Sequence, residues 1–140
     1  MKYRILVLLM VLCLTSIAQS RLGSSISEIK SEFYELSWDS YPSKNGYTIY
    51  RTYIRGNECL YYINERGYCD QFVLYPKTSG ALNWYVETYN SRYVVVDNKH
   101  WKMYSADNDE VVHIFLFFDS ESGRDYFYHA SQTFINNMKL

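Results

Sequence analysis

The sequence predicts an α+β fold: an antiparallel meander sheet with two helices packed on one of its faces. Three observations predict it. Residues 47–75 read as three consecutive strands, rich in tyrosine, isoleucine, valine and phenylalanine, with tight glycine-containing turns at 55–58 and 64–67. Segments 22–33 and 78–91 have capped, amphipathic helical patterns. The short hairpin connections disfavour parallel β–α–β units, which need long crossovers.

The first helix is marked by a serine followed three residues later by a glutamate. Ser25 is the expected N-cap, and Glu28 completes a capping box. Ile26, Ile29 and Phe33 then fall on one side of the helix. Because this apolar stripe is narrow, we expect the helix to lie on a sheet rather than inside a bundle.

The second half of the chain follows the same plan as the first. A helix begins at Thr78 or Ser79, and three or four strand patterns follow it. The most apolar of these patterns, residues 110–119, predicts a central strand, and residues 134–138 predict a short closing helix or a frayed tail. We interpret the two halves as a duplicated helix-then-strands unit. Residue identity between them is low, so the sequence leaves open whether they are a true duplication.

The start of the first helix carries a resemblance to known proteins. Leu22-Gly23, followed by Ser25-x-x-Glu28-Ile29 and then a meander, resembles small bacterial exported α+β domains, most of them of unknown function. The chain is similar in plan to small outer-membrane assembly lipoproteins and to the repeats of β-lactamase inhibitor proteins. The resemblance covers the helix closely and the remainder loosely, and the chain departs from the lipoproteins by lacking a lipobox. It implies a binding or structural role rather than catalysis.

Residues 1–18 read as a secretory signal peptide. They have a charged start, an apolar run and small residues before an expected cleavage after Ala18. The apolar run is too short to span a bilayer, and no second segment is long enough. We therefore expect residues 19–140 to form one globular domain, exported to the periplasm or the extracellular space, with no membrane span in the mature chain.

Charge excludes one class of partner. Without Lys2 and Arg4 of the signal peptide, the chain has 12 basic and 15 acidic residues, a net charge of −3. No basic stripe follows the strands or helices. Because nucleic-acid binding depends on such a footprint, we expect no nucleic-acid partner.

Two cysteines remain in the mature chain, and an oxidising compartment would allow them to form a disulfide. A two-residue turn at Glu65-Arg66 would pair Tyr62 with Cys69 and would place Cys59 on the opposite face of the sheet. This register predicts two buried, unbridged thiols. A three- or five-residue turn would restore a common face but would leave the cysteines diagonally offset, so the redox state stays open.

No pattern of catalytic or metal-binding residues stands out. His100, His113 and His129 are 13 and 16 residues apart and form no zinc motif. The chain has no G-x-S-x-G elbow and no glycine-rich phosphate loop. Asp39 and Asp70 can be nominated as a carboxylate pair for glycoside hydrolysis, but the sequence gives no support for their distance. We expect no enzyme activity, no metal and no cofactor.

Tyrosines on both faces of the predicted strands carry the functional hypothesis. Tyrosine supplies large contact area at low entropic cost, which is typical of protein-binding surfaces. We therefore expect an exported, non-enzymatic domain that binds a protein partner through an aromatic sheet face. The alternatives are a glycan-binding module or glycan hydrolase, and a structural envelope protein without a discrete ligand. The oligomeric state is open. The candidate binding residues are Tyr47, Tyr50, Tyr53, Tyr61, Tyr62 and Tyr68.

Overall fold

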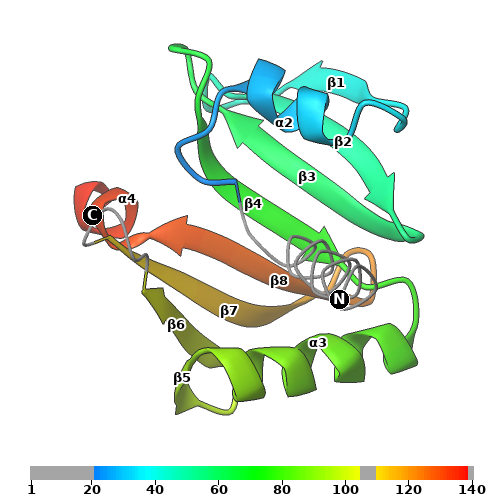
Figure 1. Cartoon of the computed structure of the whole chain (residues 1–140), viewed down its shortest axis with the longest axis vertical. Helices are drawn as coiled ribbons and strands as arrows, with labels where there is room; N and C mark the ends of the chain where they lie inside the picture. The colour runs from blue at the N-terminus through cyan, green and yellow to red at the C-terminus, as the bar shows by residue number, and fades with distance from the viewer. Residues whose placement is uncertain (1–20, 105–109, 139–140) are drawn as a thin grey trace, which may run out of the picture.

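The computed structural model describes residues 21–104 and 110–138, so the expected signal peptide lies outside the described residues. The described chain forms three helices and eight strands (Figure 1). The first unit consists of α2 (Ile26–Glu32), β1 (Asp39–Pro42), β2 (Thr48–Ile54), β3 (Asn57–Ile63) and β4 (Cys69–Tyr75). The second consists of α3 (Ser79–Arg92), β5 (Val94–Asp97), β6 (His100–Tyr104), β7 (Val111–Asp119) and β8 (Arg124–Ser131), and α4 (Gln132–Asn137) follows it.

All eight strands belong to one antiparallel sheet in the order β1-β2-β3-β4-β8-β7-β6-β5. Each unit therefore runs from an outer edge to the middle, where β4 pairs with β8. This arrangement confirms the α+β meander, and the second unit repeats the helix-then-four-strands order of the first. The most apolar strand, β7, is interior but not central as predicted, because the two units meet at β4 and β8.

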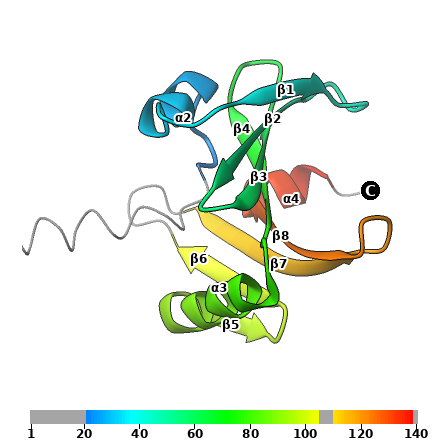
Figure 2. The same cartoon turned by 90° about the vertical axis from the view of Figure 1, so that its right-hand side faces the viewer.

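The core lies on the face of the sheet that α2 and α3 contact. Ile29 of α2 and Tyr85 and Tyr89 of α3 belong to one buried cluster with strand residues such as Trp101 and Phe127. The third helix, α4, lies on the other side of the sheet from α2 (Figure 2). None of the helices in the described part of the chain is long and apolar enough to cross a membrane.

Local contacts explain where the two longer helices begin. The Ser25 hydroxyl accepts a hydrogen bond from the Glu28 amide, and the Glu28 carboxylate accepts one from the Ser25 amide at 2.7 Å. This is the capping box that the sequence predicts, and it satisfies two amides at the start of α2. Thr78 caps α3 by accepting a hydrogen bond from the Ala81 amide at 3.1 Å.

The turn between β3 and β4 differs from the predicted one. Asn64 donates its amide hydrogen to the carbonyl of Tyr68, so three residues form the loop, and Gly67 takes the positive φ of 87° that the loop requires. A second irregularity lies between Tyr62 and Ile63, where the opposite strand accommodates Asp70 as an extra residue. Together they shift the register from the one expected for a two-residue turn.

This shift corrects the predicted placement of the cysteines. Cys69 pairs with Ile63 and Cys59 pairs with Leu74, so both thiols point to the core face rather than to opposite faces. They remain free and buried because four residues of β3 separate their positions, about 13 Å along a strand. A disulfide requires Cα atoms within about 7 Å. The predicted buried thiols are therefore confirmed. The register of the two-residue turn was wrong, and the structure has the alternative of a three-residue turn with diagonally offset cysteines.

Candidate functional site

The face of the sheet opposite the core has an aliphatic floor formed by Ile49, Leu60 and Val73. Their side chains are only 5 to 8% exposed. Of the described helices, α4 alone lies on this side, and it contacts β7 and β8. The floor is instead covered by aromatic rings that stand on β3, β4 and β8: Tyr62, Tyr75, Tyr126 and Tyr128. We call this floor and its surrounding rings the open face.

The register places these rings side by side although they come from distant parts of the chain. The ring centroids of Tyr75 and Tyr126 are 5.2 Å apart across the β4–β8 pair, and Phe117 of β7 lies 5.7 Å from Tyr126. At the margins, Phe117 is 44% exposed, Tyr53 51% and Tyr41 39%. The open face therefore carries aromatic side chains on β1–β4, β8 and β7, and the most exposed of them lie at its margins.

Burial also fixes the ionisation state of these tyrosines. Desolvation raises the pKa of Tyr75 and of Tyr128 to about 12. A tyrosine hydroxyl is already protonated at neutral pH, and the raised pKa keeps these two protonated, and able to donate hydrogen bonds, well into the alkaline range. Tyr128 donates to Gln71 Oε1 at 2.9 Å, which holds its ring over the floor.

A series of ion pairs crosses the open face from β1 to β8. Arg51 contacts Asp39 at 2.8 Å and Glu58 at 3.9 Å, and Arg124 contacts the other oxygen of Glu58 at 2.8 Å. The Arg124 guanidinium also lies 4.2 Å from the centroid of the Tyr75 ring. Because Arg51 and Arg124 are exposed to solvent, their ion pairs are screened by water and salt and contribute little to stability. Their charges compensate one another, so the aromatic surface carries no strong field of one sign.

Two histidines that the sequence spacing left apart meet at the margin of this face. His100 Nε2 lies 2.7 Å from His113 Nδ1, and His113 Nε2 lies 2.6 Å from Gln132 Oε1. Because an amide oxygen only accepts, His113 carries its hydrogen on Nε2 and accepts from His100 at Nδ1. Burial and the neighbouring His113 lower the pKa of His100. These hydrogen bonds attach α4 to the sheet, so they have a structural role.

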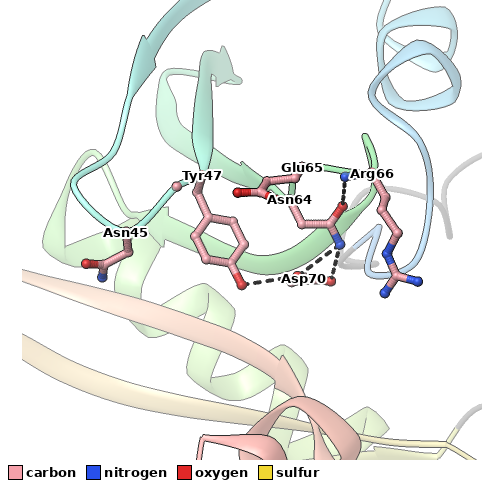
Figure 3. Close-up of a pocket in the computed structure, with 7 residues that line it drawn as sticks. Asn45, Tyr47, Asn64, Glu65, Arg66 and Asp70 are labelled. Carbon is pink, nitrogen blue, oxygen red and sulfur yellow. Dashed lines mark hydrogen bonds between the residues drawn. The ribbon is translucent and has the colours of Figure 1, made fainter.

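A polar cleft of about 420 Å³ lies beside the open face, between the β1–β2 turn and the β3–β4 turn (Figure 3). Tyr47 donates to Asp70 Oδ2 at 3.2 Å, and the Asn64 amide donates to both oxygens of Asp70 at 3.0 Å. The Asn64 carbonyl oxygen accepts from the backbone amides of Arg66 and Tyr68. The Asp70 carboxylate is thus hydrogen-bonded to its own neighbours, and these contacts shape the turn.

The geometry of the sheet does not support Asp39 and Asp70 as a carboxylate pair for glycoside hydrolysis. Asp39 is on β1 and Asp70 on β4, so three strand spacings, about 14 Å, separate them. Glycosidase carboxylates lie about 5 to 10 Å apart. Asp39 is also bound to Arg51, so the two carboxylates do not form a common site.

The structure brings three of the six predicted tyrosines to the open face or its edge. Tyr53 and Tyr62 stand on it, and Tyr47 lies beside the cleft with its ring 6.4 Å from that of Tyr62. Tyr68 is in the β3–β4 turn, 48% exposed, and forms an isolated bridge with Ser25. Of these four, Tyr53 and Tyr68 are exposed, whereas Tyr47 and Tyr62 are part-buried.

The other two predicted tyrosines point to the core face. Tyr61 is 2% exposed and packs between Trp38 and Phe72, at centroid distances of 5.7 and 4.8 Å. Its assignment to a binding surface is therefore wrong. Tyr50 pairs with Tyr61 and lies under Lys30 of α2, whose Nζ is 4.7 Å from the ring centroid. Tyr50 contributes to the contact between α2 and the sheet rather than to the open face.

Sequence reasoning missed Tyr75, which the β3–β4 pairing places on this face. It also missed Phe117, Tyr126 and Tyr128, because they join the face only through the β4–β8 and β7–β8 pairings. A signal was present in the last strand, where tyrosines at 126 and 128 alternate with buried residues. The partner strand of that segment could not be read from local pattern.

Neither a metal site nor a similarity to a known protein indicates the function of this chain. Within residues 21–104 and 110–138, no group of three or more histidine, cysteine, aspartate or glutamate side chains is arranged to hold a metal ion. No family model matches the chain, and neither does any curated protein or solved structure.

Proposed function

We propose that this chain is an exported, non-enzymatic domain that binds a protein partner through the open face. The observation that carries the proposal is an aliphatic floor covered by aromatic rings instead of a helix, with Phe117 and Tyr53 about half exposed at its margins. Contiguous apolar surface of this kind is typical of interaction sites. Rings already fixed by neighbouring rings lose little further freedom on binding.

The chemistry of the face supports a protein rather than a glycan. Sugars need unpaired polar groups beside an exposed ring. Here Gln71 is bound to Tyr128, Glu58 to Arg124 and the cleft carboxylate to Asn64. The remaining surface is apolar and aromatic, which suits the side chains of a protein partner.

The test uses two pairs of substitutions. The open-face variant combines Tyr53→Ser and Phe117→Ser. The matched control combines Tyr34→Ser with Phe118→Ser. Tyr34 and Phe118 are more exposed, at 79% and 62%, and Phe118 points to the core face because it alternates with Phe117. Partners are captured from the envelope and medium of the producing cells, and affinities are then measured with the purified partner.

We expect the open-face variant to bind at least about 30-fold more weakly, corresponding to the loss of about 2 kcal/mol at anchoring residues. The control should bind like the unaltered protein. Equal affinity of both variants would refute the proposal. Binding to a glycan array that is lost with Asp70→Asn, with no protein partner, would support the carbohydrate alternative instead.

A further inference from the structure

A small cavity of about 190 Å³ lies between the β2–β3 turn and the first half of α3. Arg55 and Asn57 border it on the side of the turn, and Ala81, Trp84 and Tyr85 border it on the side of the helix. The Trp84 ring is 48% exposed and stands edge-on against Tyr85, with 5.0 Å between the ring centroids. Apolar walls with few polar groups are typical of ligand sites, and this small volume limits the ligand to about the size of one amino-acid residue.

Tyr85 provides this cavity with a hydrogen-bond donor that its neighbours do not use. The side-chain oxygen of Asn57 accepts from the Lys77 amide at 3.0 Å, and its Nδ2 donates to the Ile54 carbonyl at 3.2 Å. Because these two bonds fix which end of the Asn57 side chain is the nitrogen, Nδ2 is also the donor to the Tyr85 hydroxyl at 3.4 Å. Tyr85 is 4% exposed, and its own hydroxyl hydrogen has no acceptor among the described residues. A buried donor of this kind is satisfied when a ligand supplies an acceptor.

Arg55 adds a positive charge to the same cavity. Burial raises the pKa of Tyr85 to about 12, and the nearby Arg55 charge opposes part of that rise. Within the part of the chain that the structure describes, the Arg55 side chain forms no ion pair and no hydrogen bond. Arg55 and Gly56 form the two-residue turn between β2 and β3, with φ of 53° and 82°. Asparagine is favoured at the first position of such a turn, so an arginine there is strained, and backbone strain is concentrated at binding sites.

We propose that this cavity binds a small carboxylate that carries an aromatic or branched apolar group. The carboxylate accepts hydrogen bonds from Arg55 and from the Tyr85 hydroxyl, and the apolar group packs against Ala81 and Trp84. Such a ligand is either a free organic acid or the last residue of a polypeptide. Tyr85 belongs to the core cluster, so this site lies on the other side of the sheet from the open face and does not depend on its function.

Phenylacetate is the probe that tests this proposal. The indole N–H signal of Trp84 in a heteronuclear NMR spectrum of the purified protein reports its binding, and Trp84→Phe assigns that signal. Because phenylacetate has about ten non-hydrogen atoms, we expect a dissociation constant on the order of 1 mM. Phenylacetamide has the same shape without the charge, so it should bind at least about tenfold more weakly.

A short peptide that ends in phenylalanine distinguishes the two sources of the ligand. If the cavity accepts chain ends, the peptide with a free carboxylate binds at least as tightly as phenylacetate, and its C-terminal amide binds at least about tenfold more weakly. If the cavity accepts free acids, the peptide with a free carboxylate binds at least about tenfold more weakly than phenylacetate. Either pattern supports a carboxylate site.

Two substitutions remove the donors one at a time. Arg55→Asn removes the cation and suits the turn, whereas Tyr85→Phe removes the hydroxyl and keeps the ring. Each should weaken phenylacetate binding at least about tenfold. Arg66→Asn is the matched control, because Arg66 is an exposed arginine in the β3–β4 turn, and it should leave phenylacetate binding unchanged.

Four results would overturn the proposal. One is a Trp84 signal that does not shift at about 20 mM phenylacetate. Another is equal binding of phenylacetamide and phenylacetate, which would show that the charge is not recognised. The third is an Arg55→Asn variant that binds phenylacetate as tightly as the unaltered protein. The fourth is an equal loss of binding with Arg66→Asn.

Discussion

The clearest quantitative prediction concerns His129, which lies on β8 and is 1% exposed. Its Nε2 is 3.3 Å from the Tyr89 hydroxyl, and its Nδ1 has no hydrogen-bond partner among the described residues. The Phe72 ring packs edge-on against it at 5.1 Å. Burial in these apolar surroundings lowers the pKa of His129 to about 3.

The unfolded chain protonates the same histidine near pH 6.5. Below that pH, the unfolded state binds one proton more than the native state, so stability falls as the pH falls until it approaches 3. As the pH falls from 7.5 to 5.5, the lowered pKa of His129 should therefore reduce the free energy of unfolding by about 1.4 kcal/mol. The histidine is destabilising in acid because its native pKa is depressed.

Urea denaturation at pH 7.5 and 5.5 measures this effect. The variant His129→Leu removes the titrating group, so its loss of stability over this range should be about 1.4 kcal/mol smaller than that of the unaltered protein. The control Tyr89→Phe removes the hydroxyl but keeps the imidazole, and it should retain the full pH dependence. If His129→Leu loses as much stability as the unaltered protein, the burial argument fails.

The remaining predictions concern a turn, a cap and the thiols. Arg55 has a φ of 53° in the β2–β3 turn, so Arg55→Asn should raise the free energy of unfolding by about 0.5 kcal/mol in urea titrations; a loss of stability would contradict this. Ser25→Ala should lower the free energy of unfolding by about 1 kcal/mol because the capping box is lost. An unchanged midpoint of the urea titration would show that the cap is dispensable. Burial raises the pKa of Cys59 and of Cys69 to about 12, so both thiols should react with a disulfide reagent at least about 100-fold more slowly in the native protein than in urea. Rapid labelling of the native protein would contradict their burial.

The local features of this fold are readable from the sequence, whereas the register is not. The cap at Ser25, the cap at Thr78 and the order of elements follow from short-range patterns, and the structure has them. The β3–β4 register depends on a three-residue turn where a two-residue turn was expected. Since a shift of one residue moves every side chain to the other face, this turn placed Cys69 on the same face as Cys59.

The open face illustrates the same limit. Tyr53 and Tyr62 could be nominated because they lie in the first unit, whose consecutive strands pair with one another. Tyr126 and Phe117 required the pairing of β8 with β4 and with β7 to be known. Tyr61 was misassigned because tyrosines occur on both faces, and composition alone does not distinguish a core tyrosine from a surface one.

Photocrosslinking at two adjacent positions tests the central claim most directly. A photoreactive phenylalanine analogue at position 117 stands on the open face, and the same group at position 118 stands on the core face with greater exposure. Irradiation in the producing cells should give one discrete adduct with another protein from position 117 and none from position 118. Adducts at both positions, or at position 118 alone, would contradict the assignment of binding to the open face.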